Sequence, residues 1–201
     1  MSSTQTTKMK VAITGTTSGI GLSTAGILES EGYDVLRINR QQIDFRFLES
    51  LKSVNLKGFD ILINNAATQT QDKLFKDITK ENIIEQVNVN LLAPMMLTHS
   101  FINQNNSGTI INITSGIVDD LRPKEVPYYV TKSGLSCFTK AVNLEEKLNF
   151  RFVEIVPRRV KSRLTHLDKE YQIDPVEVAR LIKTVIENQF ISEIKIKDHR
   201  R

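Results

Sequence analysis

Tyr128 and Lys132 stand four residues apart in a segment, residues 128–148, whose pattern predicts a helix. On a helix this spacing puts both side chains on one face, with an ammonium group beside a phenol. A free phenol has a pKa of about 10, and a neighbouring positive charge lowers that value. We therefore expect Lys132 to lower the pKa of Tyr128 and make the phenol a general acid and base. The motif is short, so a chance surface pair is the alternative interpretation.

Two further polar residues could act with this pair. Ser115 directly follows an apolar run, residues 109–114, that predicts a buried strand. Open α/β sheets bind ligands at the carboxyl ends of their strands, so Ser115 is expected in the site, although serine before glycine also suits an ordinary turn. Asn90 lies in another predicted helix, residues 80–103, where it could either serve the site or bend the backbone beside Pro94.

The turn after the first predicted strand, residues 10–14, reads Thr-Gly-Thr-Thr-Ser-Gly-Ile-Gly over residues 14–21. Glycine suits backbone positions with positive φ or in close contact with a ligand. The turn opens a predicted helix, residues 20–31, whose first amides and dipole favour a pyrophosphate. The spacing has two more residues between the first glycines than G-x-G-x-x-G, so a tight turn without a ligand is the alternative. The order strand, turn, helix favours a dinucleotide site.

Strands alternate with helices along the rest of the chain, which predicts a parallel sheet covered on both faces. Several strand candidates are uninterrupted apolar runs, as expected for strands buried on both faces. Further strands are expected at residues 34–39, near Ile43, and at residues 60–64, 109–114, 152–156 and 193–196. A last helix, residues 175–188, would begin with Asp174 as its N-cap and Pro175 in its first turn. The predicted fold class is α/β, a doubly wound sheet in one domain, residues 9–201, after a tail, residues 1–8, that we expect to be disordered.

The end of the second predicted strand, Arg37-Ile38-Asn39-Arg40, indicates which dinucleotide binds. An acidic residue there holds a free ribose 2′-hydroxyl, whereas an arginine accommodates a 2′-phosphate. The nearest carboxylate in the strand, Asp34, comes too early to compete. Arg40 therefore favours NADP(H) over NAD(H), with Arg37 as the neighbouring alternative and a solvated loop charge as the other interpretation.

Composition argues against several other classes of protein. The formal net charge of +4 arises from basic residues interleaved with acids, which argues against nucleic-acid binding. No stretch approaches the roughly 20 apolar residues of a membrane span, and the start lacks the apolar region of a signal peptide. The single cysteine, Cys137, excludes an internal disulfide. We expect a cytoplasmic protein that binds no nucleic acid, no membrane and no metal ion.

Together these motifs resemble the short-chain dehydrogenase/reductase family, which has a Rossmann-type fold. Residues 14–21 look like its T-G-x-x-x-G-x-G turn, and Asn-Asn-Ala-Ala at residues 64–67 looks like its N-N-A-G segment. Asn90 is similar to its helix asparagine, and Ser115 with Tyr128 and Lys132 matches its catalytic serine and Y-x-x-x-K in order and spacing. The resemblance runs from about residue 9 to residue 160, with a weaker echo at residues 174–179.

The resemblance implies an enzyme that interconverts a carbonyl and an alcohol by hydride transfer, with Asn90, Ser115, Tyr128 and Lys132 as its catalytic residues. Ser115 would position the substrate oxygen, and Tyr128 would give or take its proton. Lys132 would also bind the nicotinamide ribose. Asn90 would hold a water that links Lys132 to solvent.

The resemblance also implies where the cofactor lies. Asp44 would lie near the adenine, and Asn64 would line the cleft together with Ala66. The expected cofactor contacts are Gly15, Thr17, Ser18, Gly19, Ile20, Gly21, Asn39, Arg40, Asp44, Asn65, Ala66, Tyr128, Lys132, Pro157 and Val160.

The loop that begins at Pro157 departs from the family pattern. Arg158 replaces the glycine of a Pro-Gly pair, while Ser162 could still supply the hydroxyl of the usual threonine. Arg158, Arg159, Lys161 and Arg163 form a basic cluster near the expected mouth of the site. This cluster would receive a cofactor phosphate or an anionic group of a small-molecule substrate, or remain a solvated loop.

The segment between this loop and Asp174 is short for the family, so the resemblance implies a reduced lid over the substrate. Family members often pair through two long helices, here residues 80–103 and 128–148. A homodimer is therefore expected, and a tetramer stays open.

Two other functions are compatible with the same motifs. A non-catalytic regulator that binds a dinucleotide would be expected to lack Tyr128 or Lys132, and both are present. A lyase or epimerase would use the cofactor without net turnover, but the epimerase branch usually carries a substantial C-terminal substrate domain.

Overall fold

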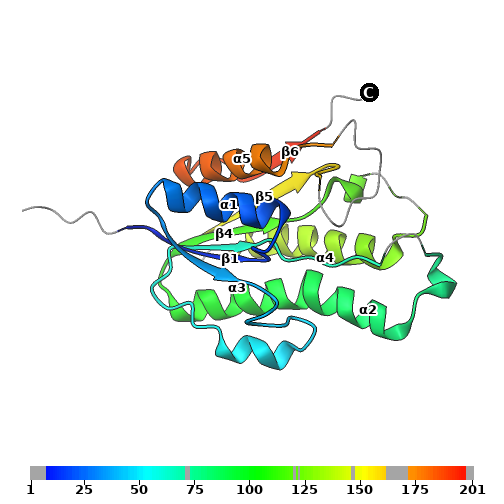
Figure 1. The fold of residues 1–201 in the computed structure, drawn as a ribbon. Coiled ribbons are helices and arrows are strands. Elements are labelled where there is room, and N and C mark those ends of the chain that lie inside the picture. Colours follow the sequence, from blue (N-terminus) through cyan, green and yellow to red (C-terminus); the bar gives the residue numbers. More distant parts are fainter. Residues whose placement is uncertain are drawn as a thin grey trace, which may run out of the picture.

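The computed structural model describes residues 8–70, 73–119, 121, 123–145, 148–161 and 172–197. Within these residues six strands form one parallel sheet in the order β2-β1-β3-β4-β5-β6 (Figure 1). The strands are β1 (Lys10–Thr14), β2 (Asp34–Ile38), β3 (Ile61–Asn64), β4 (Gly108–Ile113), β5 (Phe150–Pro157) and β6 (Glu193–Ile196). The order reverses between β1 and β3, so the doubly wound α/β fold that the alternating pattern predicts is confirmed.

Two layers of helices cover the sheet (Figure 1). Helices α1 (Gly19–Ser30) and α5 (Pro175–Glu187) lie on one face, and α2 (Lys80–Val87), α3 (Ala93–Gln104) and α4 (Val126–Val142) lie on the other. Successive side chains of a strand point to opposite faces of the sheet, so alternate residues pack into the two cores on either side of it. Val11 and Ile13 join the core under α1 and α5, whereas Ala12 joins the core under α3.

The predicted strand near Ile43 is wrong. Residues 39–43 form a turn in which the Ile43 amide donates to the carbonyl of Asn39 (2.9 Å). The Asn39 side-chain oxygen accepts the amides of Gln41 (3.0 Å) and Gln42 (3.3 Å). Such local bonds compete with strand pairing, which explains why this segment leaves the sheet.

The predicted helix at residues 80–103 is divided. A π-helical turn, Asn88–Leu92, separates α2 from α3, and Pro94 occupies the first turn of α3. A proline has no backbone N–H, so it cannot donate the usual helical hydrogen bond, and the wider π-helical turn before Pro94 accommodates this loss. The predicted start of α5 is confirmed, since Asp174 accepts the amide of Val176 at 2.8 Å.

Across the part of the chain that the structure describes, no helix is both long enough and apolar enough to cross a membrane.

Candidate active site

A cavity of about 540 Å³ opens at the carboxyl ends of the central strands. This volume lies within the range of about 300–1,000 Å³ that is typical of small-molecule sites. Segments that follow β1, β2, β3, β4 and β5 all contribute to its wall. Most of the predicted site residues line it, namely Gly15, Thr17, Ser18, Gly19, Ile20, Asn39, Arg40, Asp44, Asn65, Ala66, Ser115, Tyr128, Pro157 and Val160. Four predicted site residues do not line the cavity, namely Gly21, Asn64, Asn90 and Lys132.

The glycine turn packs so closely that side chains would not fit in it. Gly15 has a φ of 71°, and a Cβ there would lie 2.7 Å from the Cα of Ala66. At Gly21 a Cβ would lie 2.3 Å from the Gly15 carbonyl oxygen and 2.4 Å from Nδ2 of Asn65. Gly21 therefore packs against the backbone of Gly15 and the side chain of Asn65, and it does not line the cavity.

The segment after β3 fixes this turn through hydrogen bonds. The Thr14 hydroxyl accepts the amides of Asn65 (2.9 Å) and Ala66 (3.0 Å). In return, the Asn65 side-chain nitrogen donates to the carbonyls of Thr14 (2.9 Å) and Gly15 (3.1 Å). These four bonds hold the backbone of the turn rigidly against the end of β3.

The start of α1 faces the cavity through Ser18, Gly19 and Ile20. The Ser18 side chain does not cap the helix, and the first turn holds no acidic residue. A helix start of this kind attracts a phosphate through its amides and its dipole. The turn and helix therefore fit the pyrophosphate of a dinucleotide.

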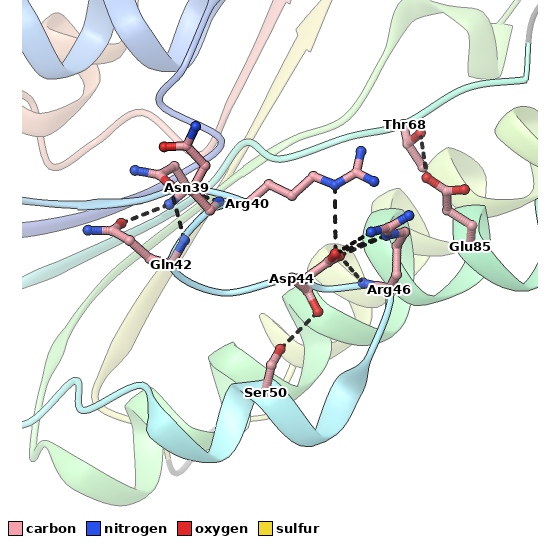
Figure 2. A network of polar contacts seen from close by, with 9 residues as sticks. Asn39, Arg40, Gln42, Asp44, Arg46, Ser50, Thr68 and Glu85 are labelled. Carbon is pink, nitrogen blue, oxygen red and sulfur yellow. Dashed lines mark hydrogen bonds and ion pairs between the residues drawn. The ribbon is translucent and has the colours of Figure 1, made fainter.

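At the end of β2 two arginines approach one carboxylate (Figure 2). Arg46 donates to Asp44 through Nε (3.0 Å) and a terminal nitrogen (2.6 Å), and Arg40 Nε lies 3.7 Å from the same carboxylate. The hydrogen bonds from Arg46 lower the pKa of Asp44. Arg46 also lines the cavity, and its guanidinium lies 5.6 Å from the ring centroid of Phe47.

Arg46 is not among the residues that the sequence predicts for this site. The only signal was a second arginine two residues after Asp44. Arg37, the predicted alternative to Arg40, is wrong as a candidate, because it forms a two-pronged ion pair with Glu29 of α1 at 2.6 and 2.7 Å. Its guanidinium is therefore engaged on α1, outside the cavity wall.

Ser115 and Tyr128 both line the cavity and are joined by a hydrogen bond. Ser115 follows β4, and Tyr128 lies in the first turns of α4. Lys132, one turn further on, is 2% exposed and donates from Nζ to the Ile113 carbonyl at 2.7 Å. Its ammonium lies 5.9 Å from the centroid of the Tyr128 ring. The predicted shared helix face is confirmed, but Lys132 lies behind the cavity wall.

The expectation that Lys132 lowers the pKa of Tyr128 is wrong for this structure. Burial raises the pKa of Tyr128 to about 12, the hydrogen bond from Ser115 lowers it, and the charge of Glu125 raises it further. Burial likewise lowers the pKa of Lys132 to about 8. Desolvation is the largest cause of both pKa changes, and the Lys132 ammonium donates to the backbone carbonyl of Ile113.

Asn90 is fully buried in the π-helical turn. Its Oδ1 accepts the amide of Thr68 (2.8 Å), and its Nδ2 donates to the Thr68 carbonyl (2.8 Å) and to the Thr131 hydroxyl (3.2 Å). The side chain thus ties the segment after β3 to α4, next to Lys132. The water that Asn90 would hold stays a prediction.

Asn64 does not line the cavity, which corrects the prediction that it would. It is 2% exposed and donates to the Thr98 hydroxyl (3.2 Å) and to Oδ1 of Asn112 (2.8 Å). Strand alternation turns Asn64 toward α3 and α4, like Leu62 before it. The cavity is reached by its neighbour Asn65.

The residues of the predicted basic cluster in the loop after β5 do not all lie in the cavity wall. Arg158 and Arg159 are half-buried and line the cavity, whereas Lys161 is exposed and lies outside its wall. Arg163 and Ser162 lie outside the described residues, as does most of the predicted short lid.

Comparison with known proteins assigns this arrangement to a family. The model of the short chain dehydrogenase family matches residues 46–172. Benzil reductase ((S)-benzoin forming) of Bacillus cereus is 30% identical over 170 residues, which are 68% of each chain. L-xylulose reductase of Mesocricetus auratus is 28% identical over 161 residues, 68% of this chain and 65% of that one. The chain belongs to the short-chain dehydrogenase family of oxidoreductases.

Solved structures share the fold over nearly the whole chain. The bulky-bulky ketone specific alcohol dehydrogenase from Comamonas testosteroni has a TM-score of 0.83 and 21% identity, covering 96% of this chain and 87% of that one. 4-Hydroxyisoleucine dehydrogenase complexed with NADH has the same TM-score and identity, covering 94% and 97%. The Rossmann-type fold expected from the sequence is therefore confirmed.

Proposed function

We propose that this protein is an NADP(H)-dependent oxidoreductase that interconverts a carbonyl and an alcohol, with Tyr128 as the general acid and base. One observation carries the proposal. The glycine turn and the hydrogen-bonded pair Ser115 and Tyr128 line one and the same cavity. A dinucleotide whose pyrophosphate lies on the turn would extend toward that pair.

The chain's own residues handle the oxygen and its proton. The bound nicotinamide would supply or accept the hydride at the substrate carbon. The Ser115 hydroxyl would hold the substrate oxygen in position for Tyr128. With a pKa raised to about 12, Tyr128 carries its proton at neutral pH, which is the state that carbonyl reduction requires. Lys132, with a pKa near 8, would stabilise the phenolate after transfer and return a proton to it.

The arginines at the end of β2 favour the phosphorylated cofactor. Arg40 and Arg46 both line the cavity there and share the single carboxylate of Asp44. Two guanidinium groups carry more positive charge than the single Asp44 carboxylate balances, so a 2′-phosphate would bind between them. The Asp44 carboxylate would then face the adenine.

A dimer would bury an exposed apolar surface. Ile84 of α2, Met96 of α3 and Val130 of α4 are exposed on the helical layer that includes α4. Such residues favour pairing of two copies through this layer. Light scattering should give twice the mass of the chain, and Val130→Asp should reduce it toward that of one chain.

The function is tested by mixing the full chain with NADPH and a panel of carbonyl compounds while following nicotinamide absorbance. The panel includes benzil, which the name of the Bacillus cereus relative suggests, and simple ketones and aldehydes. Steady oxidation of NADPH supports the proposal. Binding without turnover would favour a regulator, and product formation without net oxidation would favour a lyase or epimerase.

A further inference from the structure

The loop after β5 contributes two arginines, Arg158 and Arg159, to the cavity wall. Strand alternation would send the side chains of Arg158 and Arg159 to opposite sides, yet both line the cavity. The reason is the backbone at Arg159, whose φ of 51° lies in the left-handed region that favours glycine. Residues other than glycine in this conformation cluster at functional sites.

The backbone of this loop is held on both sides. The Arg158 amide donates to the Ile196 carbonyl of β6 at 3.0 Å. The Arg159 carbonyl accepts the amide of Ile173 at 2.9 Å, and the Lys161 amide donates to the Ile173 carbonyl at 2.9 Å. Both arginines therefore start from a fixed backbone, and a freely solvated loop is a poor description of them.

Arg158 lies close to the reacting groups. Its Cβ and Cγ would lie 3.1 and 3.2 Å from a Cβ at Gly116, the residue that directly follows Ser115. Among the described residues that line the cavity, Glu125 is a carboxylate that acts on Tyr128, while Glu85 lies within hydrogen-bond distance of Thr68. Arg158 thus adds a positive charge to the part of the cavity wall that holds Ser115.

We propose that the substrate is a carbonyl compound that carries a carboxylate, and that Arg158, with Arg159 beside it, binds this carboxylate. The inference rests on the proposed oxidoreductase function. The cofactor phosphates already have binding groups elsewhere, at the glycine turn and at Arg40 and Arg46. Arg158 lies beside Gly116, the residue after Ser115, where the substrate would bind. An arginine fork matches a carboxylate in two hydrogen bonds, which fixes orientation as well as charge.

The test compares acids with their own methyl esters under NADPH. The pairs are 4-formylbenzoate with methyl 4-formylbenzoate and 4-oxopentanoate with methyl 4-oxopentanoate. For at least one pair the acid should have a kcat/KM at least about 10-fold above that of the ester. Arg158→Gln should lower kcat/KM for that acid by about 10- to 100-fold, or about 1.4 to 2.8 kcal/mol, mostly through KM. The ester should change by less than about 3-fold.

Two further variants sharpen the result. Lys161→Gln removes the same charge from an exposed residue outside the cavity wall and should leave the preference for the acid unchanged. Arg158→Lys keeps the charge without the fork and should retain part of the preference. Equal turnover of acid and ester in both pairs would overturn the proposal and leave the oxidoreductase function standing. An equal loss for acid and ester with a raised KM for NADPH would also overturn it, because Arg158 would then hold a cofactor phosphate.

A binding measurement separates this proposal from the function on which it rests. If no carbonyl compound is turned over, the proposed function fails, and 4-(hydroxymethyl)benzoate is titrated into the protein with NADP⁺ by calorimetry. If 4-(hydroxymethyl)benzoate binds and Arg158→Gln weakens this binding at least about 10-fold, the carboxylate-binding role of Arg158 is supported. Absence of binding to the unaltered chain would overturn it.

Discussion

Replacing Lys132 by methionine should stabilise the fold in a way that depends on pH. Lys132 is 2% exposed, and burial lowers its pKa from 10.5 to about 8. Since each pKa unit corresponds to about 1.4 kcal/mol, this lowering of the pKa amounts to about 3 kcal/mol of destabilisation at low pH. Methionine removes that penalty, but it leaves the buried Ile113 carbonyl without its hydrogen-bond donor, which costs about 1–3 kcal/mol. We expect Lys132→Met to be more stable than the unaltered chain by about 1 kcal/mol at pH 7, and catalytically impaired.

The sign of the pH dependence follows from proton binding. Between pH 8 and 10.5 the unfolded chain holds a proton on Lys132 that the folded chain has released. The free energy of unfolding of the unaltered chain therefore rises with pH in this window. Tyr128, whose pKa is raised to about 12, acts in the opposite direction above about pH 10, but it is present in both proteins and its effect cancels.

Urea unfolding of both proteins at intervals from pH 7.5 to pH 10 measures the effect. The free energy of unfolding of the unaltered chain, relative to Lys132→Met, should rise by about 2 kcal/mol across this range. Lys57→Met, a change at an exposed lysine, should give a constant difference. A constant difference for Lys132→Met as well, or one that falls with pH, would refute the claim that burial disfavours this ammonium.

Three other changes have definite expected outcomes. Gly21→Ala should destabilise the fold by about 1–3 kcal/mol and weaken NADPH binding, because its Cβ would lie 2.3 Å from the Gly15 carbonyl oxygen. Urea unfolding and fluorescence titration measure the two effects, and unchanged values would contradict the packing of the turn. Arg40→Ala and Arg46→Ala should each raise the Kd for NADPH about 10-fold and that for NADH less than about 3-fold, and an equal effect on both cofactors would contradict the assignment of the 2′-phosphate. The rate of carbonyl reduction should fall above about pH 8 as Lys132 loses its proton, and a pH–rate profile that stays flat to pH 10 would contradict its role.

Much of the fold could be predicted because its signals are local. The apolar runs of the strands, the alternation with helices and the Asp174 cap all depend on residues near one another in sequence. The false strand near Ile43 has an apolar residue but lies beside Asn39, whose side chain closes a turn. In so short a segment, the sequence does not distinguish a strand from a turn closed by a side-chain hydrogen bond.

The composition of the site could be predicted further than its electrostatics. Motif residues gather because the ends of parallel strands meet at one edge of the sheet, so Ser115 and Asn65 could be expected there. The relative pKa values of Tyr128 and Lys132 depend on burial, which the whole fold decides, and here spacing alone gave the wrong sign. Arg46 escaped notice because its approach to the cavity depends on the path of a loop.

The central claim is that Tyr128 exchanges a proton with a substrate held in the same cavity as the dinucleotide. Steady-state turnover of Tyr128→Phe, with NADPH binding followed by fluorescence in the same samples, tests it most directly. We expect kcat to fall by at least about 100-fold while the Kd for NADPH stays within about 3-fold. Turnover within about 3-fold of the unaltered chain would contradict the claim.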